Sequence, residues 1–239
     1  MNNRRFAIEE LEHRSLLAVQ PFPTAPTLIG PPASGIFEGE VTGLVDSSEL
    51  QSYTVEIGEG QLFSAVLEAE NPGSAAISIR NPNGDVVAST TLGSSDPIAA
   101  QDVGSIAGTY TIEVASNLQT PSSFSLSLLF NAAYESERLG FEGNDFLTDA
   151  QSLATTFQTI TESPAARAGI LGSLDSTTGE DVDWYSLQLA NQESISLLLD
   201  TQLASSARVE IVDGSGTVVV TSWRQVGDTL FWIDLFLHR

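Results

Sequence analysis

The sequence predicts an all-β protein made of two tandem antiparallel β-sandwich domains of the jelly-roll kind, the second of them incomplete. Apolar and polar residues alternate with period two over most of the chain, and turn-forming residues separate the alternating runs. The pattern of residues 36–130 also recurs after residue 144. Many short strands with this spacing are typical of a sandwich or jelly roll. A chain of 239 residues is long enough for two such domains.

The N-terminal region, residues 1–35, predicts an export motif followed by a linker. Several residues between 1 and 18 resemble the N-terminal LEPR-XLL motif of large bacterial surface proteins, with His13 where that motif usually has Pro. They are Phe6, Glu10, Leu11, Glu12, Arg14, Leu16, Leu17 and Ala18. The resemblance implies an exported protein, extracellular or at the cell surface. Residues 21–35 carry five prolines and predict a stiff, extended linker.

The first predicted sandwich covers residues 36–130. Alternating apolar residues mark the buried face of each strand, while their neighbours are polar. These residues are Tyr53, Val55 and Ile57, then Ile77 and Ile79, then Tyr110, Ile112 and Val114, and finally Phe124, Leu126, Leu128 and Phe130. Asn83-Gly84 predicts a tight hairpin turn between two of the strands.

After a predicted linker at 131–143, the second sandwich is expected at 144–239. It repeats landmarks of the first: Asp175 corresponds to Asp46, Tyr185 to Tyr53, Leu187 to Val55, Leu189 to Ile57 and Gly216 to Gly84. On a strand, Tyr185 would continue the apolar face and lie in the core, and Trp184 would lie on the outer face. The tail DTLFWIDLFLHR would replace both closing segments of the first sandwich, GTYTIEVAS and SSFSLSLLF. We expect an open sheet edge here, and strand-mediated self-association through it.

The stretch EDVDWYSLQL and the upstream GNDFLTDAQSL resemble the bacterial pre-peptidase C-terminal domain. The resemblance covers residues 144–222 well and residues 36–130 more loosely. It implies a non-catalytic β-sandwich attached to secreted proteins, often proteases. It also implies that calcium binding or assistance in substrate binding occurs among relatives.

Four acidic residues of the second domain are candidate calcium ligands: Asp175, Glu180, Asp181 and Asp183. Calcium needs six to eight oxygen ligands, and Asp145 would add one if the fold brings it near. The alternative is a solvated acidic loop. Trp184 is a candidate ligand-binding platform, and edge packing is its alternative. We expect no required cofactor, and calcium is the one candidate ion.

Composition excludes several functions. The formal charge is −22, with 31 acidic residues against nine arginines and no lysine, so we expect no binding to nucleic acid or anionic membranes. The absence of Cys excludes disulfides, thiolate metal sites and Cys nucleophiles. His13 and His238 lie near the chain ends, where a packed catalytic triad or zinc site is not expected. No run reaches the roughly 18 apolar residues of a transmembrane span.

The sequence therefore favours a non-catalytic, exported accessory or adhesion protein that binds extracellular polysaccharide or protein. A fragment of a longer secreted hydrolase, carrying its accessory domains, is the alternative. A small hydrolase that uses carboxylates alone is a third, weaker hypothesis.

Overall fold

The computed structural model describes residues 19–22, 26–29, 34–71, 73–93, 99–104, 106–139, 141, 143–160, 163, 165–173, 182–190, 193–200, 207–224 and 230–236. The protein is all-β, as predicted: the only helices among these residues are two short 3₁₀ turns, η1 (Glu137–Leu139) and η2 (Leu147–Asp149). No helix in this part of the chain is long and apolar enough to cross a membrane. The motif of residues 1–18 lies outside the described residues.

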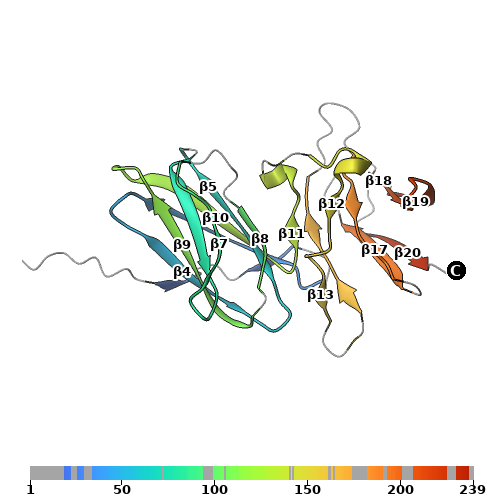
Figure 1. Ribbon diagram of the computed structural model, residues 1–239, viewed down its shortest axis with the longest axis horizontal. Coiled ribbons are helices and arrows are strands. Elements are labelled where there is room, and N and C mark those ends of the chain that lie inside the picture. Colours follow the sequence, from blue (N-terminus) through green and yellow to red (C-terminus); the bar gives the residue numbers. More distant parts are fainter. Residues whose placement is uncertain are drawn as a thin grey trace, which may run out of the picture.

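Two five-stranded sheets form a sandwich in the N-terminal half (Figure 1). One sheet has the order β1-β4-β9-β6-β7 and the other β2-β3-β10-β5-β8. The strands are β1 (Gln20–Pro21), β2 (Thr27–Leu28), β3 (Phe37–Val45), β4 (Gln51–Ile57), β5 (Phe63–Ala69), β6 (Ala75–Arg80), β7 (Val86–Ser89), β8 (Ala99–Val103), β9 (Gly108–Ser116) and β10 (Ser122–Phe130). β9 and β10 each lie at the centre of a sheet.

The predicted linker at 21–35 contributes an edge strand to each sheet. β1 pairs in parallel with β4, and β2 pairs antiparallel with β3. Both strands have two residues, and Pro21 lies in β1 at a sheet edge, where a missing N–H is tolerated. The extended conformation that prolines favour therefore serves sheet pairing here.

The core of this sandwich confirms the period-two prediction. Ile79, Ile112, Leu126 and Leu128 have no exposed surface, and the other residues predicted for the buried faces are at most 8 % exposed. These side chains form one apolar cluster between the two sheets. Since each buried aliphatic side chain contributes about 1.5–3 kcal/mol, the cluster dominates the stability of this half.

The predicted hairpin turn at Asn83-Gly84 is confirmed, and its hydrogen bonds recur later in the chain. Gly84 has a φ of 87° and its N–H donates to the carbonyl of Asn81 at 2.9 Å. Gly216 has a φ of 82° and donates to the carbonyl of Asp213 at 2.9 Å. Both glycines occupy a left-handed conformation that a Cβ disfavours.

The segment expected as a linker, 131–143, is buried at its start. Asn131, with a φ of 62°, turns the chain out of β10, and residues 131–135 are all at most 2 % exposed. β11 (Ala133–Tyr134) then pairs in parallel with β15 (Ile170–Leu171) of the C-terminal half. The start of this segment is buried, and not an exposed linker, because Ala132, Tyr134 and Leu139 form a small apolar cluster with Leu129 of the sandwich.

The C-terminal half consists of two-stranded pairs among its described residues. Their strands are β12 (Gln151–Ser152), β13 (Gln158–Thr159), β14 (Ala166–Arg167), β16 (Tyr185–Ser186), β17 (Ser194–Asp200), β18 (Ala207–Val212), β19 (Val218–Arg224) and β20 (Leu230–Phe236). The pairs are β12-β16, β13-β14, β17-β20 and β18-β19. Figure 1 shows this half extending the sandwich along the long axis.

Candidate metal site

Three carboxylates from three separate segments converge beside the junction of the two halves. Glu137 lies in η1, Asp145 precedes η2 and Asp183 precedes β16. One carboxylate oxygen from each lies within 4.8 Å of the other two. Glu137 and Asp145 are exposed and Asp183 is half-buried. We call these three residues the carboxylate cluster.

Backbone hydrogen bonds bring two of the three segments together. The buried Asn144 accepts from the N–H of Trp184 through its main-chain carbonyl at 2.8 Å. Its side-chain Nδ2 donates to the carbonyl of Trp184 at 3.0 Å. Asp145 directly follows Asn144, and Asp183 directly precedes Trp184. The main chain therefore fixes the positions of both acids.

The carboxylate of Glu137, the third of the cluster, lies directly against Gly143. A Cβ built on Gly143 would lie 2.0 Å from Oε1 of Glu137, far inside van der Waals contact. A residue with a side chain at position 143 would displace the Glu137 carboxylate from its present place. Gly143 therefore permits the close approach that completes the cluster.

A fourth carboxylate, Glu135, is fully buried and binds Tyr185. The Tyr185 hydroxyl donates to Oε1 of Glu135, and the Ser173 N–H donates to Oε2 at 2.9 Å. Burial raises the pKa of Tyr185 well above its usual range, and the hydrogen bond to Glu135 raises it further. The phenol thus stays protonated and serves as a donor.

The prediction that Tyr185 lies in the core is wrong. Tyr185 as a whole residue is 36 % exposed, whereas Tyr53 is 3 % exposed. The phenol reaches the Glu135 carboxylate, a polar partner, instead of packing within an apolar cluster.

The donor set of the carboxylate cluster suits a hard cation. Three carboxylates supply only oxygen ligands, which calcium and magnesium prefer and which zinc sites seldom use alone. The side-chain Oδ1 of Asn144, next to Asp145, is buried without a hydrogen-bond donor in the described structure. Calcium fits better than magnesium because it accepts irregular geometry and up to eight oxygens.

Of the four predicted calcium ligands, only Asp183 can be placed, and it belongs to the cluster. Asp175, Glu180 and Asp181 lie outside the described residues. Asp145, considered from the sequence, also belongs to the cluster. Glu137 was missed, because no spacing rule links a 3₁₀ turn to a strand 46 positions later; only the glycine at 143 hints at a close approach.

Trp184, the predicted binding platform, is half-buried, and both its N–H and its carbonyl form hydrogen bonds. Its carbonyl accepts from the N–H of Gln151 at 2.9 Å as well as from Asn144. These bonds fasten the start of β16 to the segment before it. Trp184 as a ligand platform stays a prediction.

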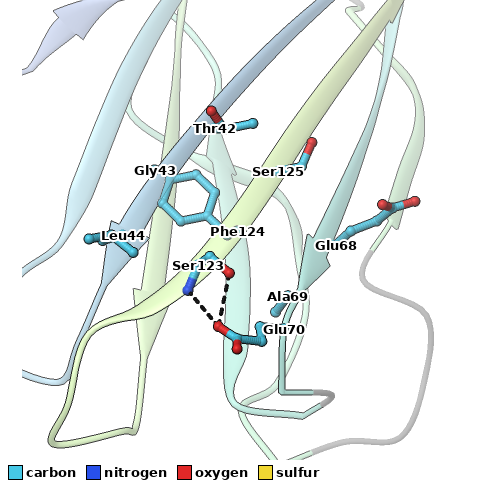
Figure 2. A pocket seen from close by; sticks show the side chains of 9 residues that line it. All are labelled: Thr42, Gly43, Leu44, Glu68, Ala69, Glu70, Ser123, Phe124 and Ser125. Atoms are coloured by element: carbon cyan, nitrogen blue, oxygen red, sulfur yellow. Dashed lines mark hydrogen bonds between the residues drawn. The ribbon is translucent and has the colours of Figure 1, made fainter.

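A shallow depression lies on β3, β5 and β10 at one end of the N-terminal sandwich (Figure 2). The Phe124 ring packs against Gly43, where a Cβ would lie 2.8 Å from the ring. Glu70 accepts from the hydroxyl of Ser123 at 2.9 Å, and Glu40 accepts from Ser125 at 2.6 Å. The acids that line the depression are Glu68 and Glu70, and Glu70 is bonded to the neighbouring Ser123.

Comparisons with known proteins give weak structural likenesses. No protein-family model and no curated protein matches the chain. Among solved structures, it is similar to PliG from Aeromonas hydrophila, a periplasmic lysozyme inhibitor of g-type lysozyme, at 15 % identity, over 41 % of this chain and 90 % of that one, with a TM-score of 0.34. PliG from Salmonella Typhimurium gives 14 % identity, 39 % and 90 % coverage, and a TM-score of 0.29. Likenesses this low carry no argument about function.

Proposed function

We propose that this chain is an exported, non-catalytic β-sandwich module that binds extracellular polysaccharide or protein, and that calcium fastens its C-terminal half at the carboxylate cluster. The convergence of Glu137, Asp145 and Asp183 is the observation that carries the calcium part of the proposal. Because the three residues come from three segments, a cation bound by them would cross-link the start of this half to β16. Its role would be structural.

Electrostatics favours a cation at this place. Three like charges with oxygens within 4.8 Å repel one another, and a divalent cation removes that repulsion. The overall charge of −22 adds to the attraction. The same charge favours neutral or basic partners over nucleic acid and anionic membranes.

Thermal unfolding of the full chain with calcium and with a chelator tests the cation site. We expect calcium to raise the unfolding temperature of the C-terminal half, since a ligand at a hundredfold excess over its Kd contributes about 2.7 kcal/mol. Asp145→Asn should abolish most of this shift. Asp149→Asn is the matched control, because Asp149 is an exposed acid four positions away and outside the cluster.

Two results would contradict the site. One is an equal calcium shift in wild type and Asp145→Asn. The other is a calcium shift confined to the N-terminal sandwich.

Partner binding is tested separately with a glycan array and with immobilised secreted proteins. Saturable binding without substrate turnover supports the module. Glycan hydrolysis that single Asp→Asn changes abolish would instead favour the hydrolase. The alternative of a fragment from a longer secreted hydrolase stays a prediction.

A further inference from the structure

The outer face of the sheet that contains β3, β10 and β5 carries acids on both sides of a column of serines. Ser123 of β10 lies opposite Leu44 of β3, and Ser125 lies opposite Glu68 of β5. Phe124, between the two serines, belongs to the core, so its neighbours and their partners point outward. We define the acidic face as six of these outward residues: Glu40, Leu44, Glu68, Glu70, Ser123 and Ser125.

The two ends of this sheet differ in what covers the outer side. At one end Leu129 of β10 forms an apolar cluster with Tyr134 and Leu139, so the chain itself covers the sheet there. At the other end Leu44 is 61 % exposed, and the three glutamates of the acidic face are exposed as well. The surface that the chain uses for its own packing therefore continues into an open surface.

The open end is hollowed along β10. Figure 2 shows a depression lined by residues of all three strands. The central strand contributes small serines, whereas Leu44 on one side and Glu68 and Glu70 on the other are longer side chains. An extended segment laid along β10 would lie in this shallow channel, with acids beside it.

Hydrogen bonds hold two of these carboxylates without neutralising them. Glu70 accepts from the hydroxyl of Ser123 at 2.9 Å, and Glu40 accepts from that of Ser125 at 2.6 Å. A serine hydroxyl adds no positive charge. Within the described residues, neither Glu68 nor Glu70 forms an ion pair. The negative charge at this end is therefore available to a partner.

The other sheet of the sandwich provides a comparison within the same molecule. On its outer side, Glu113 of β9 pairs with Arg80 of β6 at 3.4 Å. That sheet thus neutralises its central acid with a base from the neighbouring strand. The difference indicates that the charge of the acidic face is not a general property of both sheets.

We propose that the acidic face is a docking surface for an extended segment of a partner protein that carries lysine or arginine at alternate positions. Glu68 and Glu70 lie two residues apart on β5, so they project to one side about 6.7 Å apart. Alternate residues of an extended partner have the same spacing, and their cations form charge-assisted hydrogen bonds with the carboxylates. Polysaccharide is disfavoured, because the described residues of this face include no exposed aromatic ring for stacking.

This inference rests on the proposed function, of which it names the partner, and it is independent of the carboxylate cluster. The probe is a short synthetic peptide of alternating lysine and threonine. Added to the full chain at physiological salt, where weak long-range attraction is screened, it should bind saturably. In nuclear magnetic resonance spectra, the amide signals of residues 40–44, 66–70 and 123–127 should shift more than those of the other described residues.

Two double variants separate docking from general attraction. Glu68→Gln with Glu70→Gln should weaken peptide binding about fivefold or more, since exposed ion pairs each contribute modestly. Glutamine keeps an acceptor oxygen for Ser123, so this variant should unfold at the wild-type temperature. Glu56→Gln with Glu59→Gln is the matched control, because it removes two charges from exposed acids outside the acidic face. It should bind within about twofold of wild type.

Several results would overturn the docking surface. Equal weakening by both double variants, or amide shifts spread over the whole surface, would show attraction by net charge alone. Absence of saturable peptide binding would also overturn it, as would a neutral glucan oligosaccharide that shifts the same amides. If partners found on the glycan array or among immobilised proteins bind the Glu68→Gln, Glu70→Gln variant as well as wild type, this face is wrong and the proposed function stands. If no partner binds in that test, the proposed function itself is contradicted.

Discussion

At the scale of single residues, two different side chains hold the same turn. Asn81 accepts from the N–H groups of Asn83 and Asp85 through Oδ1, at 2.9 and 3.0 Å. Asp213 accepts from Ser215 and Thr217 in the same way, at 2.8 and 3.0 Å. The Ser215 hydroxyl and these two N–H groups lower the pKa of the Asp213 carboxyl. The turn thus requires an acceptor oxygen, and a charge is optional.

We therefore predict that Asp213→Asn keeps the second turn and that Asp213→Ala loses it. A carboxyl whose pKa is lower in the folded state stabilises the protein above its unfolded pKa, near 4, and that stability is lost as the pH falls through the folded pKa. The Asn variant should lack this acid-dependent loss. Exchange rates of the Ser215 and Thr217 amides between pH 2 and 6 provide the measurement. Equal rates in the Asn and Ala variants would contradict the prediction.

At the scale of elements, alternation predicted β4, β6, β9 and β10 because each of them has a buried face and a less buried one. Ile112 and Val114 follow this rule, and both have no exposed surface. The two-residue strands β1, β2 and β11 could not be predicted, since their pairing depends on distant strands and not on their own pattern. The partner of β20 was unpredictable for the same reason.

The candidate site was predictable in part. Asp183 and Asp145 stood out as acids near a strand start, but Glu137 and the buried Glu135 lie in a segment read as a linker. Their places follow from the packing of Tyr134 and Leu139, which no local pattern encodes. Tertiary contacts thus decided the part of the site that sequence reasoning missed.

Ile79 and Ile211, each directly before the register shift of its strand pair, should respond differently to truncation. Ile79→Ala removes a side chain with no exposed surface and should cost about 2–5 kcal/mol of unfolding free energy. Ile211→Ala removes a half-buried side chain and should cost about 1 kcal/mol or less. Urea unfolding of both variants checks this, and Ile211→Ala with the larger cost would contradict it.

At the scale of the whole molecule, the two halves differ in how fully they bury apolar surface. The sandwich contains the large buried cluster, and no described residue between 182 and 222 is fully buried. The structure in Figure 1 is therefore a well-packed half continued by a looser one.

Native-state hydrogen exchange should separate the two halves. Amides of β4, β6, β9 and β10 should exchange only through global opening of the sandwich, whereas those of β17 to β19 should exchange faster through local opening. Mass spectrometry of exchanged peptides measures both in one experiment. Uniform exchange across the chain would show that the halves unfold together.

The buried turn at Asn131 has a mechanical consequence. Because β10 continues through residues 131–134 into a strand of the next half, the joint offers no freely rotating tether. The end-to-end distance of a flexible tether grows only as the square root of its length. Two units joined as these are would instead add their lengths and behave as one stiff rod.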